Sequence, residues 1–170
     1  MKEISQNEWH QSQRGYFAGS LYNEMSRNPN IWLITADLGY GMLDKIRDNF
    51  PDRFLNTGAA EQSAMGIAVG LAMSGQIPFV YSITSFLLYR PFETIRNYLN
   101  YERIPVKLIG SGRDQDYEID GMSHWANEDR EVMKIFNNIE SRWPKNPQEI
   151  PDIVKEMITS DKPWYLNLER

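Results

Sequence analysis

Short apolar runs alternate with longer stretches of helical character along the chain. The runs that read as strands lie at residues 31–35, 53–56, 78–82, 106–109, 135–138 and 164–168. Helices are predicted at residues 7–27, 42–49, 60–74, 128–133 and 147–160, with a further one opening near Pro91. Short apolar strands separated by helices are typical of a parallel sheet covered on both faces. We therefore expect an α/β fold with three layers, α/β/α, around a mostly parallel sheet of about six strands, in a single domain spanning residues 1–170.

Functional residues of such a sheet gather at the carboxyl ends of its strands. This rule directs attention to four segments that follow predicted strands, namely Asp37, Gly58–Glu61, Ser82–Tyr89 and Gly110–His124. The last of them is rich in Gly and Asp and has no periodic pattern, so it is predicted to be a loop.

Composition and charge narrow the class of protein. The 170 residues are 41% hydrophobic and 24% charged, with a formal net charge of −5 and no basic stripe, so a nucleic-acid surface is not expected. The absence of cysteine excludes a disulfide framework and a thiol nucleophile, and His10 and His124 are not in a metal-binding spacing. No apolar run reaches the ~20 residues of a membrane helix, and the start has no apolar segment, so a cytoplasmic protein is expected.

Glu61 stands among small residues in the first turn of a predicted helix. The residues that recur there every fourth position, and so share one face, are Gln62, Gly66, Gly70 and Ser74. Two glycines inside a helix cost roughly 1 kcal/mol each relative to alanine, which close approach of another helix would offset. On one interpretation the Glu61 carboxylate interacts favourably with the dipole at the start of the helix, and the small face packs within the domain. On the other, the helix packs across a boundary between subunits and buries Glu61.

Two further groups of residues carry candidate chemistry. Phe86, Tyr89 and Phe92 are spaced by three, and they form either part of the core or an apolar slot for a flat heterocycle. Asp120 and His124 lie four apart on the predicted loop. They either orient and protonate a substrate oxygen or serve as a helix cap and a surface histidine.

These segments, in this order and spacing, resemble the pyrimidine-binding domain shared by transketolases and deoxyxylulose phosphate synthases. Ala60–Met65 resembles the motif around the family's catalytic Glu, and Thr84–Phe86 resembles the segment that grips the aminopyrimidine ring. Asp120–His124 matches the family's Asp-Gly-x-Thr/Ser-His. Ala36–Gly39 and Pro163–Arg170 resemble the exit of its first strand and its closing strand, so the resemblance covers nearly the whole chain.

The resemblance implies thiamine diphosphate as the cofactor, which supplies the difficult chemistry. In the family a buried Glu bonds the pyrimidine ring nitrogen and drives the amino group into the imino form that removes the thiazolium proton. By resemblance this residue is Glu61, because a buried carboxyl group can share a proton with a weakly basic ring nitrogen. Phe86, Tyr89 and Phe92 match the positions that flank the pyrimidine, and Asp37 matches a position near the cofactor.

The resemblance also assigns residues to the substrate. Asp120 and His124 fall where transketolases bind the hydroxyl groups of a ketose donor or an aldose acceptor, and His124 is the expected acid–base residue there. Arg14 and Arg170 fall where the family holds a sugar phosphate, to which the fixed donor fork of a guanidinium group is well suited.

Two departures from the family leave the substrate pair open. The segment after Asp37 lacks a serine that many transketolases use near the substrate phosphate. The loop that begins at Gly110 lacks a histidine found upstream of the Asp-Gly motif, and Arg113 is the residue that would compensate.

The family's Gly-Asp-Gly…Asn motif, which binds the diphosphate and Mg²⁺ on a separate domain, does not occur here, and its third, C-terminal domain is not found either. The resemblance therefore implies a diphosphate-binding partner subunit that holds the Mg²⁺, with no metal site in this chain. We expect an α₂β₂ heterotetramer in which the Glu61 helices meet near the two-fold axis. The leading expectation is transfer of a two-carbon ketol unit between sugars or sugar phosphates. The alternatives are a 2-oxoacid decarboxylase or deoxyxylulose-phosphate-synthase-like reaction on the same cofactor, or a non-catalytic interaction module.

Overall fold

The computed structural model describes residues 3–170, and at its centre lies a sheet in which every pair of neighbouring strands is parallel. The strands are β1 (Ile31–Thr35), β2 (Phe54–Asn56), β3 (Ile77–Ile83), β4 (Lys107–Ser111), β5 (Glu140–Arg142) and β6 (Trp164–Leu168). They form one six-stranded sheet in the order β2-β1-β3-β4-β6-β5. The predicted sheet is confirmed. Its central strands are buried along nearly their whole length, which explains their continuous apolar sequences.

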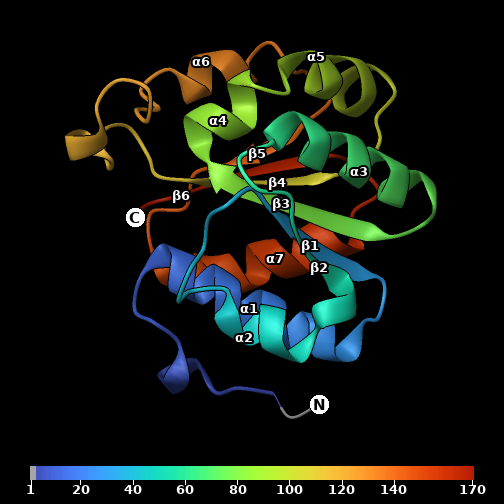
Figure 1. The fold of residues 1–170 in the computed structure, drawn as a ribbon, viewed down its shortest axis with the longest axis vertical. Coiled ribbons are helices and arrows are strands. Elements are labelled where there is room, and N and C mark those ends of the chain that lie inside the picture. Colours follow the sequence, from blue (N-terminus) through green and yellow to red (C-terminus); the bar gives the residue numbers. More distant parts are fainter. Residues whose placement is uncertain (1–2) are drawn as a thin grey trace.

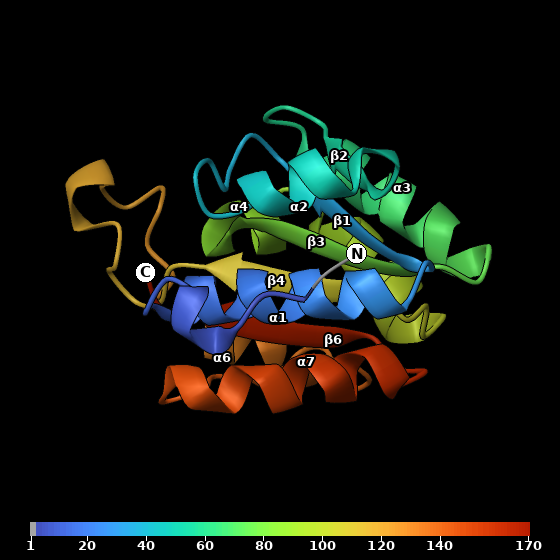
Figure 2. The same ribbon diagram turned by 90° about the horizontal axis from the view of Figure 1, so that it is seen from below.

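Helices cover both faces of the sheet, so the predicted three layers are confirmed (Figure 1). One layer contains α1 (Gln13–Arg27), α2 (Asp44–Asn49) and α7 (Ile150–Thr159), and Figure 2, which views the molecule from this side, shows α1 and α7 side by side in front of the sheet. The other layer contains α3 (Glu61–Met73), α4 (Thr84–Tyr89), α5 (Phe92–Thr94) and α6 (Asp129–Met133). Each layer has its own apolar core against the sheet. Phe17 packs on Phe79 below it, whereas Met65 and Val80 belong to the core above it.

Helix α1 begins later than the sequence pattern predicts. A separate 3₁₀ turn, Gln6–Glu8, precedes it, and Ser12 caps α1 by accepting a hydrogen bond from the Gly15 amide at 3.1 Å. Between the two, the chain folds back so that the Trp9 indole covers Gly19, where a methyl group would lie 2.4 Å from the ring. A helix running from residue 7 would not place Trp9 on this surface, so burial of the indole outweighs the local helical pattern.

A helix opens at Pro91 as predicted, since Pro91 is the N-cap of α5, but a further helix that the sequence pattern did not predict precedes it. Helix α4 begins at Thr84, directly after β3, and Pro91 lies between α4 and α5. Proline lacks an amide hydrogen, so it interrupts the helical hydrogen bonds at this point. The chain continues beyond α5 as a π-helical turn, Ile95–Tyr101.

The predicted strand at residues 135–138 is a turn, and the edge strand is the more polar Glu140–Arg142. The side chain of Asn100 accepts a hydrogen bond from the Asn138 amide at 3.0 Å, and the Asn138 side chain donates to the Asn100 carbonyl at 2.9 Å. These two bonds hold residue 138 in the turn. The apolar residue Phe136 is buried against Phe92 rather than in the sheet, which explains why an apolar run here does not mark a strand.

Candidate functional site

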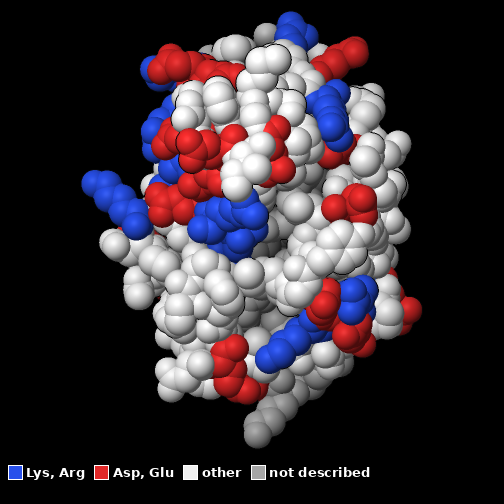
Figure 3. All heavy atoms as spheres, turned by 60° about the vertical axis from the view of Figure 1, so that its left-hand side comes forward, with Lys and Arg blue, Asp and Glu red and all other residues white. Residues whose placement is uncertain are grey.

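A small cavity of about 170 Å³ opens where the carboxyl ends of β1 and β3 meet. The residues that line it are Ala36, Asp37, Leu38, Ala59, Glu61, Ser82, Ile83, Phe86 and Arg90. The chain order reverses at this point of the sheet, because β1 is followed by β2 on one side and β3 on the other. Ligands of open α/β sheets bind at such switch points. Figure 3 views the molecule from the side of these strand ends and shows its surface hollowed, with basic side chains at the rim.

Glu61 lies at the inner end of this cavity. It is the first residue of α3, and its side chain is only 2% exposed. The hydroxyl group of Ser82 donates a hydrogen bond to Oε1 at 3.2 Å, and Nη1 of Arg90 donates to Oε2 at 2.6 Å. Both carboxylate oxygens therefore have a partner, as a buried charge requires.

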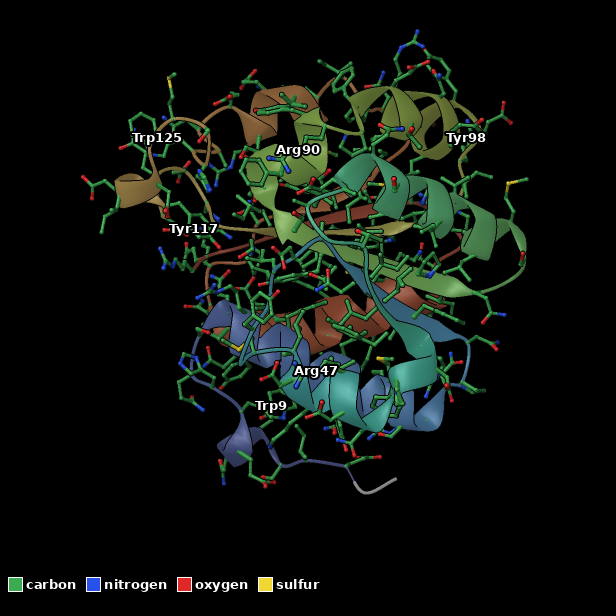
Figure 4. The ribbon with its side chains drawn as sticks, viewed as in Figure 1. Trp9, Arg47, Arg90, Tyr98, Tyr117 and Trp125 are labelled. Atoms are coloured by element: carbon green, nitrogen blue, oxygen red, sulfur yellow. The ribbon has the colours of Figure 1, made fainter. Side chains whose placement is uncertain are left out.

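Arg90 approaches Glu61 from the end of helix α4 (Figure 4). Its guanidinium group also lies over the ring of Phe86, with the central carbon 3.7 Å from the ring centroid. Phe86 and Arg90 are four residues apart in a helical segment, so they share one face. The sequence analysis assigned no role to Arg90, and it included Ser82 only as the first residue of a segment that follows a strand. Arg90 could have been found from the sequence, because it lies four residues after Phe86, which was a predicted site residue.

His124 reaches the same site from the loop between β4 and α6. Its ring lies 4.8 Å from the Phe86 ring in an edge-on contact. The Ser85 hydroxyl group donates a hydrogen bond to the Ser123 carbonyl at 2.7 Å, which ties the loop to α4. The structure thus brings together Glu61, Phe86 and His124, three of the predicted site residues, from three separate segments.

Asp37 also lines the cavity, in a strained backbone conformation with φ of 52°. Its amide donates a hydrogen bond to the Asn56 side chain at 2.9 Å, and the hydroxyl group of Tyr40 donates to its carboxylate. The hydrogen bond to Asp37 raises the pKa of Tyr40. Non-glycine residues with positive φ cluster at functional sites, which agrees with the position of Asp37 at a strand end.

Two of the predicted aromatic residues do not line the cavity. Phe92 packs against Phe136, with ring centroids 5.2 Å apart, in the core above the sheet. Tyr89 is 38% exposed; burial raises its pKa, and the neighbouring Glu128 adds to the shift. Of these three aromatic residues only Phe86 lines the cavity with Glu61, so the roles of Tyr89 and Phe92 at a pyrimidine ring stay predictions.

Of the two predicted phosphate-binding arginines, Arg170 lies beside Tyr117 and Arg14 lies beside Tyr81. The guanidinium group of Arg170 lies 4.7 Å from the centroid of the Tyr117 ring. Tyr117 shares a hydrogen bond of 2.9 Å with Ser111. Burial raises the pKa of Tyr81, whereas the Ser111 hydrogen bond and the charge of Arg14 act in the opposite direction, which places Arg14 beside this group. The Nε of Arg14 is buried, and no residue from 3 to 170 accepts a hydrogen bond from it.

The loop that carries Asp120 projects from the molecule, and Asp120 is exposed on it (Figure 4). Ile119 at its tip is fully exposed and Met122 is 85% exposed. Arg113, at the base of the loop, is buried and donates hydrogen bonds to Asn167 and Glu169. Its guanidinium group is thus engaged in the structural framework, so it is not free to replace the missing family histidine.

The face of α3 that carries the small residues is exposed. Gln62, Gly66, Gly70 and Ser74 all lie at the surface of the chain. A methyl group added at Gly66 or Gly70 would have no atom within 4 Å. The interpretation in which this face packs inside the same domain is therefore wrong for the described residues, and the glycines have no compensating contact within the chain.

No group of three or more His, Cys, Asp or Glu side chains in residues 3–170 is arranged to hold a metal ion. Likewise, none of the described helices combines the length and the apolar character that crossing a membrane requires.

The arrangement around Glu61 suits a flat, nitrogen-containing ring. A buried carboxylate accepts N–H hydrogen bonds, the face of Phe86 offers a stacking surface, and the cavity opens to solvent beside them. The aminopyrimidine of thiamine diphosphate has such an edge and face, so the donor and acceptor set fits that group.

Comparison with known proteins identifies a family for nearly all of the chain. Residues 11–170 match the family described as the pyrimidine binding domain of transketolase. A putative transketolase C-terminal section from Methanocaldococcus jannaschii is 31% identical over 142 residues, which cover 83% of this chain and 45% of that protein. A subunit of apulose-4-phosphate transketolase from Actinobacillus succinogenes is 34% identical over 120 residues, which cover 71% of this chain and 39% of that protein. This chain thus spans less than half the length of these two relatives.

A solved structure described as a split gene transketolase, inactive beta4 tetramer, has the same fold. It superposes with a TM-score of 0.83 at 32% identity and covers 94% of this chain and 51% of that one. The predicted family is confirmed by sequence and by fold. The chain belongs to the family of transketolase pyrimidine-binding domains.

Proposed function

We propose that this chain is the pyrimidine-binding subunit of a split, thiamine-diphosphate-dependent enzyme that transfers a two-carbon ketol unit between sugars or sugar phosphates. The single observation that supports this most strongly is the buried Glu61 carboxylate facing Phe86 in a cavity at the switch point of the sheet. We propose that residues 1–170 form a single pyrimidine-binding domain. The relatives named as a transketolase C-terminal section and as one subunit of a transketolase support a divided enzyme.

Glu61 accepts a hydrogen bond from the pyrimidine ring in this proposal, and it holds the shared proton at the ring nitrogen. Ser82 orients the carboxylate through its hydrogen bond to Oε1, and Phe86 supports one face of the ring. Tyr89, Phe92 and Asp37 belong to the surroundings of the cofactor. Thiamine diphosphate, when bound, supplies the carbon nucleophile that carries the transferred unit.

The substrate lies on the side of Phe86 where His124 contacts it. His124 transfers a proton to or from a sugar oxygen, and Asp120 binds a hydroxyl group. Arg170, which lies beside Tyr117, and Arg14, which lies beside Tyr81, bind a phosphate group at the far end of the substrate. The relative named for apulose-4-phosphate supports a phosphorylated sugar of some kind.

The diphosphate and its Mg²⁺ bind to a partner subunit, as the resemblance to the family implies; no group of three or more acidic or His side chains in the described residues is arranged to hold the ion. The exposed small face of α3 is the contact with another subunit, where the absence of side chains permits close helix approach. We propose an α₂β₂ heterotetramer in which this face lies near the two-fold axis. The split gene transketolase solved as an inactive beta4 tetramer supports the dependence on a second kind of subunit.

The test compares the isolated chain, the complex with its diphosphate-binding partner, and the complex carrying Glu61→Gln. We expect no turnover by the isolated chain, ketol transfer by the complex, and a loss of at least about 100-fold in kcat for Glu61→Gln, in the range typical of proton-transfer residues. Size-exclusion chromatography should show that the variant complex still assembles.

An active homo-oligomer of this chain alone would contradict the proposal, and so would an unchanged rate for Glu61→Gln, which is the result expected of a non-catalytic module. The matched control is Glu93→Gln on α5, a substitution at a residue that does not line the cavity. Offering 2-oxoacids to the same complex distinguishes ketol transfer between sugars from the decarboxylase and synthase alternatives, because only the two alternatives release CO₂ from these substrates.

A further inference from the structure

Arg90 occupies the place beside Glu61 where the proposed function puts the pyrimidine ring. We propose that the Arg90 guanidinium group is an internal occupant of the aminopyrimidine site, which closes the site in the empty chain and leaves when the cofactor ring enters. The inference rests on the proposed function, and it adds an autoinhibitory contact to it.

The two contacts of Arg90 are those expected of an aminopyrimidine. A guanidinium group is planar and donates N–H bonds from its edge, and here it donates to Oε2 of Glu61 at 2.6 Å. Its central carbon lies over the Phe86 ring, 3.7 Å from the centroid. One planar group thus uses both the carboxylate and the aromatic face, which are the two recognition elements of the cavity.

The Arg90 guanidinium group and the pyrimidine ring cannot occupy the site at the same time. Ser82 donates to Oε1 and Arg90 donates to Oε2, so a ring nitrogen that pairs with Oε2 from above Phe86 must take the place of the guanidinium group. The cavity measures about 170 Å³ with Arg90 as part of its lining, so a ring stacked on Phe86 requires the guanidinium group to move.

Arg90 is able to leave, whereas Glu61 is not. The side chain of Arg90 is 42% exposed, so its guanidinium group can turn into solvent without crossing the core. Glu61 is 2% exposed and fixed at the start of α3. An unpaired carboxylate at this depth is strongly destabilising, and the internal ion pair keeps it satisfied until a ligand replaces Arg90. The apparent affinity for the ring is then reduced by the fraction of chains in which the site is closed.

The experiment is an NMR titration of the isolated full chain with thiamine, followed at the methyl groups of Ile83, which lines the cavity. We expect Arg90→Met to bind thiamine about tenfold more tightly than the unmodified chain, as for a site closed in roughly nine chains out of ten. Arg90→Gln keeps an N–H donor for Glu61 and serves if the Met variant fails to fold. Arg96→Met is the matched control, because Arg96 contacts Tyr101 and Asn97 and does not line the cavity.

A second measurement uses Arg90→Ala, in which guanidinium chloride at millimolar concentration should occupy the vacated place and compete with thiamine. Thiamine binding that is unchanged or weaker in Arg90→Met and Arg90→Gln overturns the inference, as does an equal gain in Arg96→Met. The absence of guanidinium competition in Arg90→Ala overturns it as well. The proposed function is judged separately, by turnover of the complex carrying Glu61→Gln, so an active complex whose thiamine affinity ignores Arg90 refutes only this inference.

Discussion

At the scale of single residues, the candidate site depends on one buried carboxylate and on the groups that hold it. Glu61 would be costly to bury alone, and its two oxygens are shared between a fixed donor, Ser82, and a movable one, Arg90. Ser82 is 1% exposed at the end of β3, so its hydroxyl group has little freedom. Ser82 is therefore a positioning residue that sets the direction in which Oε2 faces the cavity.

Replacing Ser82 by alanine should weaken the site without dismantling the fold. The loss of one hydrogen bond to a buried charge is worth about 1–2 kcal/mol, so we expect thiamine diphosphate to bind the complex roughly tenfold more weakly. Isothermal titration calorimetry measures this change. Ser20→Ala is the control, since Ser20 is also buried but lies in α1, below the sheet. Equal affinity in the two variants would show that Ser82 does not position Glu61.

At the scale of elements, helix α3 has two faces with different purposes. Its buried face is built from Ala64, Ala68 and Ala72 against the sheet, with Met65 in the core. On its exposed face a methyl group added at Gly66 or Gly70 would have no atom of residues 3–170 within 4 Å. Gly75, with φ of 81°, ends the helix in the left-handed conformation that suits glycine. In the proposed function these glycines allow close packing of α3 against another subunit, which would offset their cost within a helix.

Substitutions at Gly66 separate folding from assembly. Gly66→Ala should raise the free energy of unfolding by about 0.5–1 kcal/mol, because alanine is the better helix former and the added methyl group meets nothing. Gly66→Leu should leave the chain folded but prevent close helix approach, so sedimentation should detect loss of the oligomer. Urea unfolding of dilute protein provides the first measurement. A Leu variant that assembles normally would remove α3 from the interface.

At the scale of the whole molecule, one buried lysine ties the start of β4 to the connection that leads into the closing strand. Lys107 begins β4, is 1% exposed, and donates hydrogen bonds to the carbonyl groups of Ser160 and Lys162 at 2.9 and 2.6 Å. Burial lowers the pKa of Lys107 from 10.5 to about 8, with an opposing effect of Asp161. The stability of the fold therefore depends on pH above neutrality.

Between pH 8 and 10.5 the unfolded chain holds a proton on Lys107 that the folded chain has lost, so the free energy of unfolding rises with pH in this window. We subtract the unfolding free energy of Lys107→Met from that of the unmodified chain. This value should rise by about 2 kcal/mol from pH 7 to pH 10, because only the unmodified chain gains stability from Lys107 as the pH increases. Other titrating groups cancel in this difference. Urea denaturation at several pH values measures it, and a flat difference would mean that Lys107 keeps an ordinary pKa.

The sequence pattern was sufficient for much of the architecture. The strands Ile31–Thr35 and Trp164–Leu168 coincide with their predicted ranges, because fully buried parallel strands are apolar throughout. Errors arose where a long-range contact decided the local structure. Trp9 packs on Gly19 instead of extending α1, and Asn100 holds residue 138 in a turn.

The sequence by itself determined the family, the three layers and the candidate carboxylate, because motif spacing and hydrophobic periodicity are local properties of the chain. Only the tertiary structure decided which residues meet. It brought His124 onto Phe86, placed the glycines of α3 at the surface, and put Arg90 on the Glu61 carboxylate, 29 positions away in sequence. Such contacts join distant segments or depend on what lies outside a helix, and no periodicity encodes them. The closed state of the site thus depends on tertiary packing, because the fold places the Arg90 guanidinium group within hydrogen-bonding distance of the buried Glu61 carboxylate.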